Sequence, residues 1–132
     1  MIDGVVDASL AEIELSESDA DVNRQVLGCS SALTDRGKEA DHKKVEFPGV
    51  GEADGRRMLH ALADYWEVHA GSLVPDDLEL SLNKASLDRE FNPGVILGGE
   101  GFGFWAYYQS EEGTSTGVFR LWADGPCASY EP

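Results

Sequence analysis

Residues 95–123 have the sequence VILGGEGFGFWAYYQSEEGTSTGVFRLWA, in which three apolar and aromatic runs are separated by turn residues. The runs cover residues 95–97, 102–109 and 118–123. Strand-forming runs of this length, bounded by Gly, Ser and Thr, are typical of antiparallel hairpins. We therefore predict that this part of the chain folds as a meander of antiparallel strands.

The chain upstream of the meander contains one clear helical pattern. The apolar face predicted for a helix over residues 53–70 is formed by Met58, Leu62, Tyr65, Trp66 and His69. Gly71 follows in the position of a C-terminal cap. Residues 78–83 alternate between apolar and polar and predict a strand, and a shorter strand is expected at residues 44–47.

The N-terminal third has weaker patterns. Apolar residues alternate with acids over residues 9–15, which favours a strand there, with a helix as the alternative. Val22, Val26, Cys29 and Leu33 recur at helical spacing and predict a helix over residues 19–33. Residues 34–44 are polar and without periodicity, so a mobile connection is expected.

The predicted order of elements is strand, helix, strand, helix and about four more strands. Because the strands gather in the C-terminal half, we predict an α+β fold in which two helices pack on one face of a mostly antiparallel sheet of about five or six strands. A chain of this length buries about two-thirds of its surface on folding. Residues 1–132 are therefore expected to form a single globular domain, with residues 124–132 as a flexible tail.

Charge is the strongest feature of the composition. The chain has 25 acids and 10 Lys and Arg, a net charge of −15 at neutral pH. Such a field repels nucleic acid and anionic lipid and attracts basic proteins. We expect no direct nucleic-acid or membrane partner, and the lack of an export, membrane-spanning or lipidation pattern predicts a cytoplasmic protein.

No pattern of a metal or cofactor site is complete. Asp19, Asp21 and Asn23 match the first three ligand positions of a calcium loop, but Arg24 follows where glycine is required. The glycines of residues 99–103 precede a strand-like run instead of the helix that a phosphate loop needs. Two cysteines, Cys29 and Cys127, are too few for a zinc site or disulfide scaffold. We predict no metal and no cofactor.

The acids cluster in the N-terminal segment. Residues 1–23 hold seven acids and no base. On the predicted strand, Glu12 and Glu14 would lie about 6.7 Å apart, and on the predicted helix Glu17 and Asp21 would lie about 5 to 6 Å apart. The candidate binding residues here are Glu12, Glu14, Glu17, Asp19 and Asp21. A regularly spaced row of carboxylates is a plausible mimic of phosphates, and a merely solubilising acidic surface is the alternative.

Aromatic residues supply a second candidate surface. In the predicted strand over residues 102–109, Phe102, Phe104 and Tyr108 share one face, and Trp105 and Tyr107 share the other. If the first set faces the core, Trp105 and Tyr107 are available to anchor a protein partner. Pairing of this hairpin within a homodimer is the alternative.

Together these features predict an acidic, non-enzymatic protein that binds and inhibits a basic protein, most plausibly one that handles nucleic acid. Anti-CRISPR, anti-restriction and toxin-immunity proteins are classes that work in this way. The alternatives are a small enzyme that uses carboxylates or His60, four residues before Asp64, in a cleft, and a self-assembling structural protein.

Overall fold

The computed structural model describes residues 2–28, 38–75, 78–99, 101–126 and 128–129. The elements in chain order are α1 (Ile2–Glu12), a 3-10 helix η1 (Glu17–Asp19), β1 (Asp21–Gly28), β2 (Lys38–Gly51), α2 (Glu52–Leu73), β3 (Ser81–Asn83), β4 (Gly94–Gly99), β5 (Phe102–Ser110), β6 (Thr116–Asp124) and β7 (Ala128–Ser129). None of the helices among the described residues is long and apolar enough to cross a membrane.

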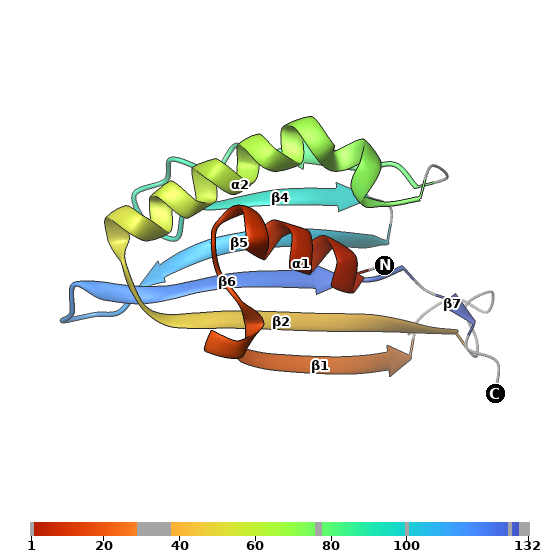
Figure 1. Ribbon diagram of the computed structural model, residues 1–132, viewed down its shortest axis with the longest axis horizontal. Helices are drawn as coiled ribbons and strands as arrows, with labels where there is room; N and C mark the ends of the chain where they lie inside the picture. Colours follow the sequence, from red (N-terminus) through yellow and green to blue (C-terminus); the bar gives the residue numbers. More distant parts are fainter. Residues whose placement is uncertain (1, 29–37, 76–77, 100, 127, 130–132) are drawn as a thin grey trace.

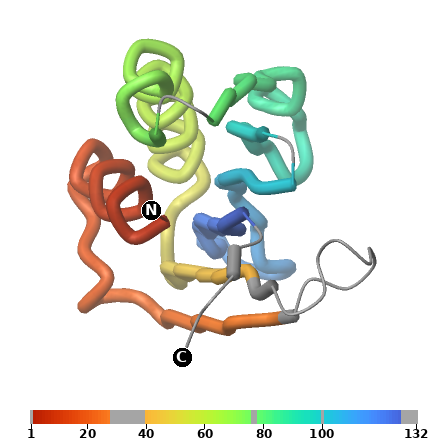
Figure 2. The backbone as a smooth tube through the Cα atoms, turned by 90° about the vertical axis from the view of Figure 1, so that its right-hand side faces the viewer, coloured from red at the N-terminus to blue at the C-terminus, as the bar shows by residue number. Residues whose placement is uncertain are grey.

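All strands form one antiparallel sheet. Six of them follow the order β1-β2-β6-β5-β4-β3, and the short β7 pairs with the first residues of β2. Helix α2 packs against β4 and β5, and α1 packs against β6 and β2 (Figure 1). Figure 2 shows both helices on the same side of the sheet. The predicted α+β fold with two helices on one face of an antiparallel sheet is confirmed.

The core lies between the two helices and the sheet. Helix α2 contributes Leu59, Leu62 and Trp66, each fully buried, and the sheet contributes large side chains such as Phe104 and Phe119. The indole Nε1 of Trp66 donates a hydrogen bond of 2.9 Å to the buried hydroxyl of Ser9 in α1. This bond joins the two helices in the interior.

The prediction of a strand over residues 9–15 is wrong, because this segment ends helix α1 and continues as a turn. The residues of α1 and the following turn that are buried recur every three or four positions: Ile2, Val5, Val6, Ser9, Leu10 and Ile13. That helical pattern begins seven residues before the segment from which the strand was predicted. The alternation of Ala11, Ile13 and Leu15 belongs to the end of the helix and the turn after it.

The predicted helix over residues 19–33 is also wrong, since Asp21–Gly28 form strand β1. Val22 and Val26, which suggested a helical face, lie on one side of β1 and are both about half exposed. Strand β1 is therefore held in place by its pairing with β2, and burial of its side chains contributes little to its stability. Residues 38–44, predicted as part of a connection, belong to β2. Cys29, Cys127 and residues 29–37 lie outside the described residues.

The predictions of a helix over residues 53–70 and of the three strands within residues 95–123 are confirmed. The predicted helix over residues 53–70 lies within α2, and the runs at 95–97, 102–109 and 118–123 lie within β4, β5 and β6. The predicted strand at 44–47 is part of β2, and that at 78–83 is shortened to β3. In the predicted tail, Asp124 ends β6 and Ala128–Ser129 form β7.

Candidate protein-binding surface

The sheet has one face that no helix of the described residues covers, and we call it the open face. On β5, Phe104, Ala106 and Tyr108 are buried beneath the helices, whereas Trp105 and Tyr107 are half-buried on the other side. The predicted division of the aromatic residues between two faces is thereby confirmed. Side chains alternate between the two faces along a strand, and cross-strand partners share a face. The buried residues of β5 therefore identify which side chains of the other strands lie on the open face.

The strand register aligns these side chains in rows across the sheet. The central row contains, from β1 to β3, Asn23, Lys44, Trp122, Trp105, Ile96 and Asn83. The neighbouring row contains Asp21, Glu46, Arg120 and Tyr107. Because cross-strand neighbours lie about 5 Å apart, each row is a nearly continuous line of contacting side chains.

Three aromatic rings form the centre of the open face. The ring centroids of Trp105 and Trp122 lie 5.1 Å apart with a tilt of 51°. Tyr107 meets Trp122 edge-on at 6.0 Å. Exposed Ile96 extends the apolar surface from Trp105 onto β4. Rings fixed on central strands lose little conformational freedom when they bind another surface.

Two cations lie against these rings. The ammonium of Lys44 is 5.1 Å from the centroid of a Trp122 ring, and the guanidinium of Arg120 is 5.5 Å from the ring of Tyr107. Arg120 Nε also donates a 2.7 Å hydrogen bond to Glu46. This bond holds the pKa of Glu46 below its usual range. Burial alone would lower the pKa of Arg120, but its interactions with Glu46 and Tyr107 together outweigh this effect and raise that pKa. The cations and acids here leave the centre of the open face close to neutral.

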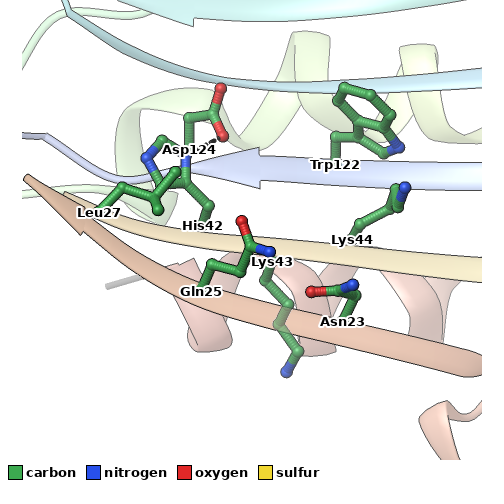
Figure 3. A pocket seen from close by; sticks show the side chains of 8 residues that line it. All are labelled: Asn23, Gln25, Leu27, His42, Lys43, Lys44, Trp122 and Asp124. Carbon is green, nitrogen blue, oxygen red and sulfur yellow. Dashed lines mark hydrogen bonds and ion pairs between the residues drawn. The ribbon is translucent and has the colours of Figure 1, made fainter.

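A hollow of about 250 Å³ lies on the open face between β1 and β6. Figure 3 shows the side chains of Asn23, Gln25 and His42 around it, and the side chain of Lys43 turned to the other side of the sheet. Nδ1 of His42 is 2.5 Å from Oδ1 of Asp124. The hollow thus offers amide, imidazole and carboxylate groups beside the Trp122 indole.

The predicted acidic residues gather at the corner where α1 leads into β1. Glu12 ends α1, Glu14 lies in the turn with a positive φ of 58°, and Asp19 ends η1. Asp21 begins β1. These four side chains are exposed and form no ion pair with another described residue. We call Glu12, Glu14, Asp19 and Asp21 the acidic corner.

Glu17 differs from its neighbours because it forms an ion pair with Lys43. The spacings predicted for Glu12 with Glu14, and for Glu17 with Asp21, are wrong because neither pair lies within one strand or one helix. The carboxylates of the acidic corner therefore form an irregular cluster.

Lys43 is the buried centre of an ion-pair network beneath α1. Its side chain is only 7% exposed, and its ammonium lies 2.9 Å from Asp3 in addition to the pair with Glu17. Burial would lower the pKa of Lys43, but its hydrogen bonds to Glu17 and Asp3 outweigh this effect and raise that pKa. The Arg24 guanidinium, on β1, donates hydrogen bonds to Asp3 in α1 and to Asp41 in β2. The network attaches α1 and η1 to the edge of the sheet.

Of the predicted acidic residues, only Asp21 is placed on the open face by the strand register, whereas Glu12, Glu14, Glu17 and Asp19 belong to α1, η1 and the turn between them. Asp21 shares a cross-strand row with Tyr107, three strands away, which corresponds to about 14 Å. Trp122, Lys44 and Arg120 were missed as site residues, because only the strand register shows that they meet Trp105 and Tyr107. The alternation of Arg120 and Trp122 with buried residues in the sequence was the available signal.

The other candidate groups lie elsewhere. His60 is on α2, largely exposed, and its Nε2 lies 2.9 Å from Asp88 and not beside Asp64. The glycines at 99–103 belong to the β4–β5 hairpin, where Gly101 has a positive φ of 75°. Over the part of the chain that the structure describes, no group of three or more His, Cys, Asp or Glu could hold a metal ion.

Comparison with protein-family models, with curated proteins and with solved structures finds no match for this chain. The assignment of a function therefore depends on the surface itself.

Proposed function

We propose that this protein is a non-enzymatic interaction protein that binds a basic protein and blocks its nucleic-acid site, in the manner of anti-CRISPR, anti-restriction or toxin-immunity proteins. The observation that carries the proposal is the row of aromatic side chains on the uncovered sheet face, one of whose cross-strand rows ends at Asp21 of the acidic corner. Cytoplasmic action is part of the same proposal.

The aromatic rings supply the anchoring part of the mechanism. Trp and Tyr dominate the binding energy of protein interfaces when they become buried at the centre of a contact. Trp105, Trp122 and Tyr107 are half-buried and central in the sheet. A partner that covers them removes apolar surface from water without ordering a flexible loop, which lowers the entropic cost of binding.

The acidic corner supplies steering and charge mimicry. All four of its carboxylates are exposed, and that of Asp21 ends a cross-strand row of the open face, whose aromatic centre is itself close to neutral. A Lys- and Arg-rich groove built for phosphates attracts such carboxylates and is occupied by them. The partner would therefore be drawn to the acidic corner and anchored by the rings, and the bound protein would exclude nucleic acid.

The first test obtains the partner and measures competition. The protein is immobilised as bait, nuclease-treated host extract is passed over it, and a stoichiometric basic protein is eluted as salt is raised. The purified partner is then titrated with a labelled oligonucleotide in the presence of this protein. We expect displacement of the oligonucleotide; a ternary complex with undiminished oligonucleotide binding would contradict the proposal.

Kinetics with variants test the two parts of the surface separately. Reversing the acidic corner (Glu12→Lys, Glu14→Lys, Asp19→Lys and Asp21→Lys) should lower the association rate about tenfold or more at low salt. Glu17 is kept because it pairs with Lys43. The matched control changes four exposed acids elsewhere: Asp64→Lys, Glu79→Lys, Glu111→Lys and Glu112→Lys. Equal loss in both variants would show that only net charge matters.

Removal of the aromatic anchors should raise the rate at which the complex with the partner dissociates. Trp105→Ala together with Tyr107→Ala should speed dissociation by about tenfold or more, as expected for central aromatic contacts. Phe91→Ala is the control, since Phe91 is an aromatic residue that is 74% exposed and follows Arg89 and Glu90, whose carbonyls accept hydrogen bonds from Arg56 of α2. Unchanged dissociation in a folded double variant would remove the open face from the mechanism.

A further inference from the structure

Strand β1 leaves one edge of the sheet unoccupied. The strand order ends at β1, and no described segment pairs with its outer side. β1 has eight residues, whereas β3 at the opposite edge has three. Every side chain from Asp21 to Leu27 is exposed. A long edge of this kind carries a row of backbone N–H and C=O groups that can accept another strand.

Three of the exposed side chains of β1 are apolar. Val22, Val26 and Leu27 are 45%, 53% and 48% exposed, and they divide between the two faces of the strand. Natural sheets protect exposed edges with Lys, Pro or a very short strand. β1 contains none of these, and its one cation, Arg24, is held by Asp3 and Asp41.

The charge around this edge indicates what kind of strand it accepts. Among the described side chains on or beside β1, six are carboxylates and three are Lys or Arg. The carboxylates are those of Asp3, Glu17, Asp19, Asp21, Asp41 and Glu46, and the cations are Arg24, Lys43 and Lys44. A basic segment would reduce this excess, whereas a second copy of this chain would bring another net charge of −15.

We infer that β1 is a strand-addition site for an extended segment of the basic partner, with alternating apolar and basic side chains. Added strands gain affinity from main-chain hydrogen bonds and specificity from alternate side chains. The side chains on one face would lie beside Asn23, Gln25 and Leu27, which line the hollow on the open face. The partner's charge rests on the proposed function, but the unoccupied edge is a separate observation.

A peptide titration tests the edge without the natural partner. The probe is an eight-residue peptide of alternating Val and Lys with blocked termini. It is added to the labelled protein, and amide hydrogen exchange is followed by NMR. We expect slower exchange at amides of β1. A peptide with methylated backbone nitrogens keeps the side chains but loses the N–H donors, so it should give no protection, and neither should a Val and Glu peptide.

A matched pair of variants then separates the edge from general effects of charge. Val26→Lys places a protective cation on the edge, and Val68→Lys makes the same change at a residue of α2 that is 75% exposed. We expect Val26→Lys to weaken peptide and partner binding about tenfold and Val68→Lys to change it less than about twofold. Equal binding by the two variants, or peptide shifts confined to Trp105 and Trp122, would overturn the inference.

Sedimentation of the protein alone tests whether a second copy of this chain occupies the edge of β1 instead. A dimer that forms with rising concentration and is lost in Val26→Lys would assign the edge to a second copy and overturn the inference. The proposed function fails separately: it is contradicted if partner binding is insensitive to the acidic corner and to Trp105, whatever Val26→Lys does.

Discussion

Lys43 shows how much one buried cation can do in an acidic protein. It lies beneath α1, where it neutralises Asp3 and Glu17 and joins three elements. We expect Lys43→Met to lower the free energy of unfolding by about 1 kcal/mol, because Glu17 loses its cation and the half-exposed Asp3 keeps only Arg24. Urea unfolding measures this change.

Lys84→Met is the control for that experiment. Lys84 pairs with Glu67 at 3.2 Å, but both side chains are well exposed. Lys84→Met should lower the free energy of unfolding by less than about 0.5 kcal/mol. If Lys43→Met proved as stable as the unaltered protein, the carboxylates would have to be satisfied by water, and the network would contribute nothing to holding α1.

Asp3 gives this network a dependence on pH. The hydrogen bond from Lys43, with help from Arg24, holds the pKa of Asp3 below its usual range. A carboxyl whose pKa is lowered by folding stabilises the fold above its ordinary pKa, roughly 4, and loses that effect as pH falls through the lowered value. Asp3→Asn should therefore be less stable by under about 1 kcal/mol at neutral pH, since Asp3 is 48% exposed.

Thermal unfolding from pH 7 to pH 2 measures the difference between Asp3→Asn and the unaltered protein. The difference should be constant above about pH 5 and should shrink below about pH 4 as Asp3 becomes protonated. A difference that persists undiminished at the lowest pH would show that Asp3 acts through packing or helix capping and not through its charge.

On the scale of elements, helix α2 contains two glycines with opposite roles. A Cβ on Gly55 would lie 2.4 Å from a ring carbon of Tyr108 in β5, whereas a Cβ on Gly71 would meet nothing within 4 Å. Alanine normally stabilises a helix relative to glycine by about 1 kcal/mol. Gly71→Ala should therefore raise the melting temperature, and Gly55→Ala should lower it through overpacking of about 1 to 3 kcal/mol. If both Gly71→Ala and Gly55→Ala stabilised the protein, α2 would have to shift on the sheet to avoid the clash with Tyr108.

The elements also show where sequence reasoning succeeds and fails. The strands β4, β5 and β6 were predictable because their buried side chains alternate and turns separate them. Strand β1 was not, since its side chains are exposed on both faces and its conformation depends on pairing with the strand that follows it, β2. Helix α1 was missed because its buried positions begin at Ile2, ahead of the alternation at residues 11–15.

The candidate site was predictable in part for the same reason. The face occupied by Trp105 and Tyr107 follows from alternation within β5 alone. Their neighbours Trp122 and Lys44 come from other strands, and a shift of one residue in register would remove them from the open face. The placement of Glu12, Glu14 and Glu17 in α1, a turn and η1 was not predictable, because the buried positions of α1 begin ahead of the alternation at residues 11–15.

On the scale of the whole molecule, the net charge of −15 should make the fold sensitive to salt. Exposed like charges repel one another, and ions shorten the range of that repulsion to about 8 Å at physiological ionic strength. We expect the melting temperature to rise by about 3 to 5 °C, or roughly 1 kcal/mol, between low and moderate salt. The ion pairs of Lys43 and Arg24 weaken in salt, so the rise measures the balance of both effects.

Neutralising the acidic corner separates stability from function. Replacing Glu12 and Glu14 by Gln, and Asp19 and Asp21 by Asn, removes four charges and reduces the net charge from −15 to −11. Because these side chains form no ion pair with other described residues, the variant should melt higher at low salt and depend less on salt. If it also associates more slowly with the basic partner, then the acidic corner lowers the stability of the free protein, and its role in binding accounts for its presence. A variant that is no more stable and binds as fast would reduce the acidic corner to a solubilising surface.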